Sequence, residues 1–326
     1  MQDPSPTTSA PGQQPPRRPR AAINVDIDGL YLYDRIHGHA GASGNTADFS
    51  AASHDATVWT KGVTRFLDLF ARTGIQATFF VVAQDLENPE VQAVLRDLVA
   101  AGHEIGSHSL THPYDLSRRP AAEIVNELTS ARAKLQDATG QAVTGFRAPG
   151  YVLSTPLRLA IADAGHAWDS SRFPCPAYQA AKLSAITLYH LLGRPSGSVA
   201  ETPDIWLGPR TPYVDRLPDG RALLEMPIGV IPRIRWPLIG TSLIMAGLPG
   251  WLALRPLTRT MDWFNFELHG IDLTDHEADG IPDRLKTQPD QWIALRRKWP
   301  LLVRVCEDLR QSHDIRTLGQ WAESEI

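Results

Sequence analysis

Apolar residues follow two different spacings along the first half of the chain, which predicts a mixed α/β protein. An unbroken apolar run at residues 77–83 is typical of a strand buried on both faces. Apolar positions three and four residues apart predict a helix at 58–73, ended by Gly74. The same reasoning places strands at 21–28, 103–106, from 146 onward and at 168–171, and helices at 89–101, 121–139 and 156–164. Strands and helices alternate, so we expect a parallel sheet or barrel with functional residues at the carboxyl ends of its strands.

Two stretches break this alternation. Residues 34–55 are rich in Gly, Ser and His and predict a long surface loop, a feature that is often functional. Residues 175–260 contain many Pro and Gly and are predicted to be irregular. They include residues 236–254, which carry no charge over about the length of a membrane span but are interrupted by Pro and Gly. We interpret 236–254 as a buried or capping segment, and an interfacial apolar lip that contacts lipid is the alternative.

Charge and cysteine content exclude several classes of protein. The 326 residues have a net charge of −4, which argues against a nucleic-acid partner because such proteins usually carry a clustered basic excess. Only Cys175 and Cys306 are present, so neither a disulfide framework nor a thiolate zinc site can form. Any metal must therefore be bound by histidines and carboxylates.

The first twenty residues differ in composition from the rest of the chain. Residues 1–20 are rich in Pro, Gln, Ser and Thr and lack the apolar core of a secretory signal, so we expect a disordered tail and, by default, a cytoplasmic location. Residues 21–326 are long enough for one large α/β barrel domain, although length alone also permits two domains.

A histidine pair provides the first candidate site. His108 and His112 are four residues apart, which is one helical turn and would let both imidazoles face one ion. Asp28, at a strand end, can supply an anionic third ligand, and Asp26 lies on the same face of that strand, placed to accept a proton from water. Arg147 can keep both carboxylates ionised. Two surface histidines and a surface arginine are the alternative reading of these residues.

Several motifs in the same order resemble the polysaccharide deacetylase (NodB-homology) family, which corresponds to carbohydrate esterase family 4. The motifs that carry the resemblance are Asp-Ile-Asp-Gly at 26–29, Ala-Thr-Phe-Phe at 77–80, His-Ser-Leu-Thr-His at 108–112, Arg-Ala-Pro-Gly at 147–150 and Leu-His at 268–269. The resemblance covers residues 21–171 and returns at 262–272. It implies a distorted (β/α) barrel that holds a divalent metal, most often Zn²⁺, with Co²⁺, Ni²⁺ or Mn²⁺ as further options.

The resemblance also implies a role for each matched residue. Asp28, His108 and His112 would bind the metal. Asp26 would be the general base, oriented by Arg147, and His269 the general acid. Tyr151 would donate its backbone N–H to the oxyanion hole. The Asp-x-Asp spacing resembles the branch of the family in which one residue separates base and ligand.

Three acidic residues have no assigned role. Glu267 stands where the family usually has an apolar residue, and it either faces solvent or positions His269. Asp272 follows three residues after His269, and Asp169 belongs to an Asp-Ser-Ser strand end that is equally consistent with a structural or a functional role.

The function implied is a metal-dependent hydrolase that removes an N-acyl group, acetyl or formyl, from an amino sugar in a glycan or linked to a lipid. The expected partner is that N-acylated sugar, and residues 236–254 give the only indication of peripheral membrane contact. A hydrolase of a small cyclic amide or imide would use the same site chemistry. A non-catalytic glycan-binding relic is a further alternative, which the presence of base, ligands, Arg147 and His269 together disfavours.

Overall fold

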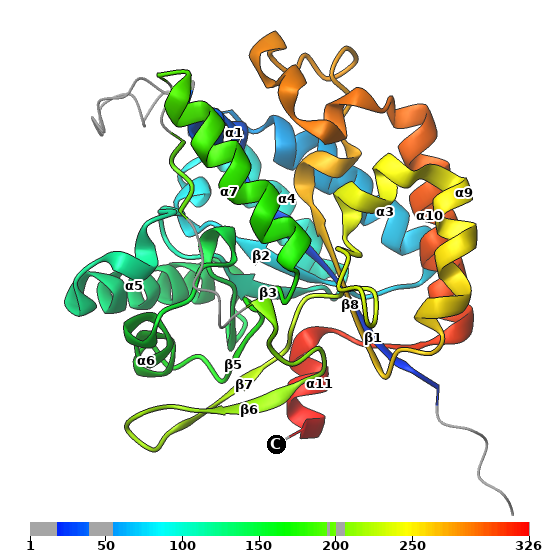
Figure 1. Cartoon of the computed structure of the whole chain (residues 1–326). Coiled ribbons are helices and arrows are strands. Elements are labelled where there is room, and N and C mark those ends of the chain that lie inside the picture. Colours follow the sequence, from blue (N-terminus) through cyan, green and yellow to red (C-terminus); the bar gives the residue numbers. More distant parts are fainter. Residues whose placement is uncertain (1–17, 39–54, 194–195, 200–205, 326) are drawn as a thin grey trace, which may run out of the picture.

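The computed structural model describes residues 18–38, 55–193, 196–199 and 206–325 (Figure 1). The predictions for residues 1–17 and for most of the 34–55 loop lie outside these residues. Arg20, the last residue of the predicted tail, already belongs to the first strand.

Nine strands in the described part of the chain form one curled sheet. Their bounds are β1 Arg20–Ile27, β2 Thr78–Val81, β3 Glu104–Ser107, β4 Gly145–Phe146, β5 Trp168–Asp169, β6 Tyr213–Arg216, β7 Ala222–Glu225, β8 Trp263–His269 and β9 Asp314–Ile315. The order is β6-β7-β5-β4-β3-β2-β1-β8, with β9 beside the start of β1, and β6 is the antiparallel edge strand. The central strands are parallel, so their carboxyl ends meet at one end of the sheet.

The two ends of this sheet approach each other through the chain that follows β7. The backbone N–H of Met226 donates to Asp169 on the β5 side, and that of Gly229 donates to Asn265 of β8. These bonds close the curled sheet into a distorted barrel, which confirms the fold expected from the sequence.

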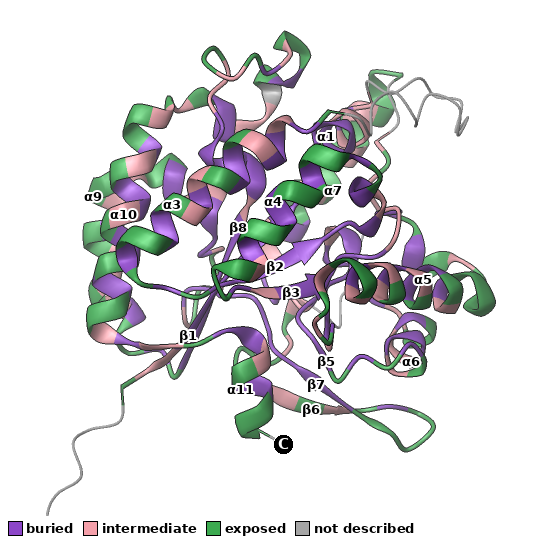
Figure 2. Ribbon diagram, turned by 180° about the vertical axis from the view of Figure 1, so that it is seen from behind, coloured by how far each residue is buried: buried purple, intermediate pink, exposed green. Residues whose placement is uncertain are grey.

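The helices surround the sheet and bury its strands (Figures 1 and 2). They are α1 Leu30–Ile36, α3 Thr64–Thr73, α4 Pro89–Ala100, α5 Ala121–Thr139, α6 Thr155–Asp163, α7 Pro176–Leu191, α9 Gly240–Thr258, α10 Leu295–Ser312 and α11 Leu318–Glu325. A π-helical segment, Val58–Val63, precedes α3. Gly74 ends α3 and Gly140 ends α5, both in the left-handed conformation that glycine adopts without strain. The helices predicted at 58–73, 89–101, 121–139 and 156–164 are therefore confirmed.

The irregular region expected at 175–260 was wrong, because it contains α7, the β6–β7 hairpin and α9. Apolar residues lie on every side of α7, so no helical spacing marks it in the sequence. In α9, Gly247 (φ 64°, ψ −169°) breaks the helix and Pro249 lies near the start of the second part, where proline is tolerated. The start of the loop was also predicted too early, at residue 34, because α1 extends to Ile36.

The uncharged segment 236–254 is only partly buried, unlike the buried or capping segment expected. Leu243 and Trp251 lie in the core, whereas Trp236, Leu248 and Leu252 are exposed. Within the described ranges, none of the helices has the length and apolar content required to cross a bilayer.

We expect Gly145→Ala to destabilise the protein by about 1–3 kcal/mol, because the added methyl group would overlap the buried indole of Trp168 on the neighbouring strand. Gly197→Ala is the control, since its nearest neighbours lie 3.5 Å or further away, and we expect a change within about 0.5 kcal/mol. Urea unfolding of both variants measures the difference. Equal stabilities would contradict the close contact of β4 and β5.

Candidate active site

Three potential metal ligands meet where β1 and β3 end. Asp28 follows β1 directly, and its Oδ1 atom lies 3.5 Å from Nε2 of His108 and 3.5 Å from Nε2 of His112. All three side chains are buried. The structure therefore brings together the three residues that the sequence proposes as ligands, in a group compact enough for one metal ion.

The two histidines converge through a tight loop rather than through the helical turn that their spacing suggested. His108 continues from β3, with its backbone N–H bonded to Val81 of β2. Ser109 and His112 both have left-handed backbones, with φ of 68° and 53°, and the Ser109 hydroxyl accepts a hydrogen bond from the His112 N–H at 3.0 Å. Left-handed non-glycine residues cost about 1–2 kcal/mol each, and such strain is typical of functional loops.

Hydrogen bonding leaves the ligand atoms of this group available. Nδ1 of His108 donates to the Arg147 carbonyl at 2.8 Å, which fixes the tautomer whose Nε2 carries the lone pair. Burial lowers the pKa of His112, so its ring is neutral, and burial raises the pKa of Asp28. Among the described residues, both ring nitrogens of His112 and Oδ1 of Asp28 have no hydrogen-bond partner.

These unpartnered atoms fit a divalent metal. Ligand atoms at about 2.0–2.2 Å from a tetrahedral zinc are about 3.3 Å apart, close to the 3.5 Å that separates Asp28 from each histidine. Two imidazoles and one carboxylate are also the donor types of a catalytic zinc centre that keeps a fourth position open.

Arg147 connects this group to the rest of the barrel. Its guanidinium is fully buried, donates to Asp26 Oδ1 at 2.6 Å and to Asn24 Oδ1 at 2.5 Å, and lies 4.1 Å from the centroid of the Phe80 ring. Its other nitrogens donate to the carbonyl and the hydroxyl of Ser170, each at 2.8 Å. The carboxylate of Asp26 is thereby fixed with one oxygen on the arginine and the other, Oδ2, 4.0 Å from Nε2 of His108.

A second acid–base group lies on β8, the strand beside β1. Residue 26 of β1 is the register partner of residue 269 of β8. Nδ1 of His269 lies 3.0 Å from Glu267 Oε1, and the Tyr151 hydroxyl donates to the same oxygen at 2.8 Å. Burial alone would lower the pKa of His269, but the surrounding carboxylates, Glu267 foremost, raise it to about 10. His269 is therefore protonated at neutral pH.

The structure answers the question left open for Glu267. Its side chain is fully buried and contacts His269, so it positions the imidazole and does not face solvent. Asp272 holds the same histidine from the other side, because its Oδ2 accepts the His269 backbone N–H at 2.9 Å. Asp169 is buried behind the site, where it accepts from the Ser171 hydroxyl, which in turn accepts the Ala148 N–H at 2.7 Å.

Tyr151 is placed differently from the expectation. Its backbone N–H, expected in the oxyanion hole, donates to the Ala148 carbonyl at 3.0 Å within a tight turn. Its hydroxyl instead faces the interior, 2.8 Å from Glu267 and 3.2 Å from Nε2 of His269. The phenol is thus the part of Tyr151 that contacts the other site residues in this structure.

Sequence analysis did not identify three polar residues that surround Arg147: Asn24, Ser170 and Asn265. Asn265 donates to the Ser170 hydroxyl at 3.0 Å and accepts from the side chain of Asn24. Asn24 lies two residues before Asp26, and Asn265 two before Glu267, so the alternation of a strand places both toward the site. That alternation was the available signal.

Comparison with known proteins agrees with this geometry. Residues 49–168 match the family model for polysaccharide deacetylase. A chitooligosaccharide deacetylase of Bradyrhizobium sp. (strain ANU 289) is 37% identical over 101 residues, which are 30% of this chain and 44% of the relative. A solved structure described as a polysaccharide deacetylase from Mycobacterium smegmatis is 19% identical, with a TM-score of 0.58 over 98% of this chain and 94% of that one. The allantoinase Puue is 18% identical, with a TM-score of 0.56 over 97% and 93%.

The fold and the site define an α/β barrel with a candidate metal centre, and residues 49–168 of the chain match the polysaccharide deacetylase (NodB-homology) family. The sequence match includes His108, His112, Arg147 and Tyr151, whereas Asp26, Asp28 and His269 lie outside it and join the site through β1 and β8. The chain spans less than half the length of the first curated relatives that it matches.

We expect Asp28→Ala and His108→Ala to weaken zinc binding by more than the roughly 10- to 100-fold that loss of an outer-shell partner costs. Elemental analysis after dialysis against zinc, compared with the exposed-histidine control His190→Ala, measures this effect. Equal zinc content in all three variants would show that this group does not hold the metal.

Proposed function

We propose that the chain is a metal-dependent amide hydrolase that removes an N-acyl group from an amino sugar, in a glycan or linked to a lipid. The observation that carries the proposal is the placement of a carboxylate and a protonated imidazole beside the three-ligand group. Atoms of Asp26, Glu267 and His269 lie within 4.8 Å of one another. Deacetylation requires one group that accepts a proton and a second that donates one.

Asp26 is suited to accept the proton. Arg147 occupies its Oδ1 atom and holds the carboxylate in one orientation, so Oδ2, on the side of His108, is the oxygen that receives a proton from the attacking water. Zn²⁺ held by Asp28, His108 and His112 would polarise the acyl carbonyl and acidify that water, and Co²⁺, Ni²⁺ or Mn²⁺ would supply the same chemistry.

His269 is suited to donate a proton to the departing amine. The carboxylate of Glu267 holds Nδ1, which leaves Nε2 as the donating atom, and the neighbouring Tyr151 hydroxyl keeps that edge of the ring polar. Loss of the amine with its proton completes cleavage of the carbon–nitrogen bond.

The same residues also suit a cyclic amide. A fold shared with an allantoinase at 18% identity does not decide between the two substrates. The carboxylate, the imidazole and Arg147 are all in place, which favours an enzyme over a glycan-binding relic. Acetate or formate release from N-acylated chito-oligosaccharides, measured beside opening of a cyclic imide, with and without chelator, tests the proposal. Faster chelator-sensitive turnover of the imide, or no turnover of either substrate, would contradict it.

Asp26→Asn is expected to retain zinc but to lower kcat by about 100- to 10,000-fold, because the amide cannot accept the proton. Acid release and metal content are measured on the same preparation. A variant with normal turnover would mean that another group is the base.

Glu267→Gln is expected to move the alkaline limb of the kcat profile to lower pH. Removing the carboxylate lowers the pKa of His269 from about 10, so the protonated acid is lost earlier as pH rises. Asp272→Asn, which removes a carboxylate that bonds only to the His269 backbone, is expected to give a smaller displacement. An unchanged alkaline limb in Glu267→Gln would exclude His269 as the group seen in the profile.

A further inference from the structure

Exposed apolar side chains are concentrated in one stretch of this chain. Of the twelve large hydrophobic residues that are exposed in the described chain, eleven lie between residues 183 and 252, and Trp292 is the other. Single exposed apolar residues are ordinary, whereas a cluster of them marks a surface that contacts something other than water.

Three elements build this surface. The first is α7, which crosses in front of the sheet in Figure 1 and exposes Leu183, Leu188 and Leu191. The second is the loop at 232–238, with Ile234 and Trp236 exposed, and the third is α9, which exposes Met245, Leu248 and Leu252. The loop is held against the start of α7 because Arg235 donates to the carbonyl of Pro174. Ala177 and Tyr178 of α7 pack with Val230 and Ile239, next to the start of α9. We call this surface the acid-free face.

The two stretches of chain that build this face carry no acidic residue, although Asp308 of α10 pairs with Arg255. Residues 226–261 contain four arginines, at 233, 235, 255 and 259, and no acidic residue, although the whole chain has a net charge of −4. Residues 173–193 likewise contain Lys182 and no acidic residue. An apolar surface flanked by cations is the pattern of a protein segment that lies in the headgroup region of a bilayer.

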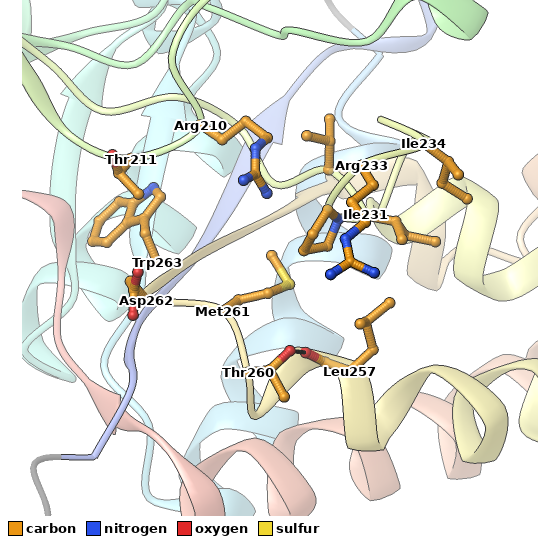
Figure 3. A pocket seen from close by; sticks show the side chains of 12 residues that line it. Arg210, Thr211, Ile231, Arg233, Ile234, Leu257, Thr260, Met261, Asp262 and Trp263 are labelled. Atoms are coloured by element: carbon orange, nitrogen blue, oxygen red, sulfur yellow. Dashed lines mark hydrogen bonds between the residues drawn. The ribbon is translucent and has the colours of Figure 1, made fainter.

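A cavity of about 760 Å³ lies beside the 232–238 loop and the end of α9 (Figure 3). Arg210 and Arg233 line it together with Ile231, Leu257 and Met261, and Asp262 lies at its edge. Within the described residues, neither Arg210 nor Arg233 has an ion pair or a hydrogen bond through its guanidinium, so both are available to an anion.

The acid-free face also borders the candidate active site. Lys182 of α7 donates to the carbonyl of Gly150, directly before Tyr151, at 2.9 Å. Gly240, the first residue of α9, packs so closely on Asp272 that a methyl group there would overlap the carboxylate. Whatever binds the acid-free face is therefore held next to the residues that surround His269.

Charge decides between the possible occupants. A second copy of the chain in a twofold dimer would place the same arginines opposite one another, with Asp262 at the cavity edge and Asp308, which already pairs with Arg255, as the acidic residues near them. A glycan would require hydrogen-bonding side chains, whereas the exposed part of α9 offers aliphatic ones. An anionic lipid surface satisfies both features, because acyl chains accept the leucines and phosphates accept the arginines.

We propose that the acid-free face docks this protein on an anionic lipid bilayer, with Leu248 and Leu252 in the interface and Arg210 and Arg233 on lipid phosphates. Docking by this face does not require the hydrolase activity proposed above, and the two proposals can fail separately.

Co-flotation with vesicles tests the docking directly. Wild-type protein is expected to float with vesicles of phosphatidylcholine and phosphatidylglycerol, more weakly with phosphatidylcholine alone, and less at high salt. The double change Leu248→Glu with Leu252→Glu is expected to reduce partitioning by at least about tenfold on both vesicles. Arg210→Gln and Arg233→Gln are each expected to reduce it about fivefold, on anionic vesicles only.

Val214→Glu is the control, because it introduces one glutamate at an exposed apolar residue of the β6–β7 hairpin, outside the three elements of the face, and it is expected to float like wild type. Thermal unfolding of each variant establishes that it is folded. Failure of wild type to float, or equal flotation of the Leu248/Leu252 variant and the control, would overturn the proposal. A dimer in solution that Leu248→Glu dissociates would overturn it in favour of a second copy of the chain.

Discussion

The buried guanidinium of Arg147 is the interaction on which the site depends. It donates to groups from β1 and from the end of β5, and its own carbonyl fixes the ring of His108. A buried charge is costly unless it is paired and hydrogen-bonded, and Arg147 meets that condition through four hydrogen bonds to Asn24, Asp26 and Ser170. Because these partners come from separate strands, Arg147 fixes the positions of Asn24, Asp26 and Ser170 relative to one another.

The pairing of β1 with β8 explains why Asp26 and His269 lie next to each other. Polar residues occupy alternate positions on both strands, and the register places residue 26 opposite residue 269 and residue 24 opposite residue 267. A slip of one residue would turn either row to the other face of the sheet. The interior of the barrel then holds Asp26, Asp28 and Glu267 against Arg147 and His269, an excess of acid that a divalent cation would reduce.

The sequence was sufficient to predict most strands and helices of the first half and to name the candidate ligands. The end of a strand and the spacing of two histidines are local signals that can be read without the fold. It was insufficient for α7, whose apolar residues lie all around the helix and obey no period. The loop geometry of His108 and His112 and the orientation of Tyr151 also escaped it, since left-handed backbones at non-glycine residues are imposed by tertiary contacts. The role of Glu267 depended on its distance from His269, which spacing alone cannot provide.

The segment between β5 and β8 therefore contributes both to the buried barrel interior and to the exposed apolar surface. Between β5 and β8 the backbone closes the barrel through residues 226–229, and on either side of that closure it carries α7 and α9 with their exposed leucines. The buried side of the segment contributes Tyr178 and Ile239 to the packing around Tyr151, so the rigid polar interior supports the apolar exterior. Asp272, which holds the backbone of His269, is also in close contact with Gly240, the first residue of α9. This contact fixes the start of α9 against the site, while the outer face of the helix remains exposed and free to bind.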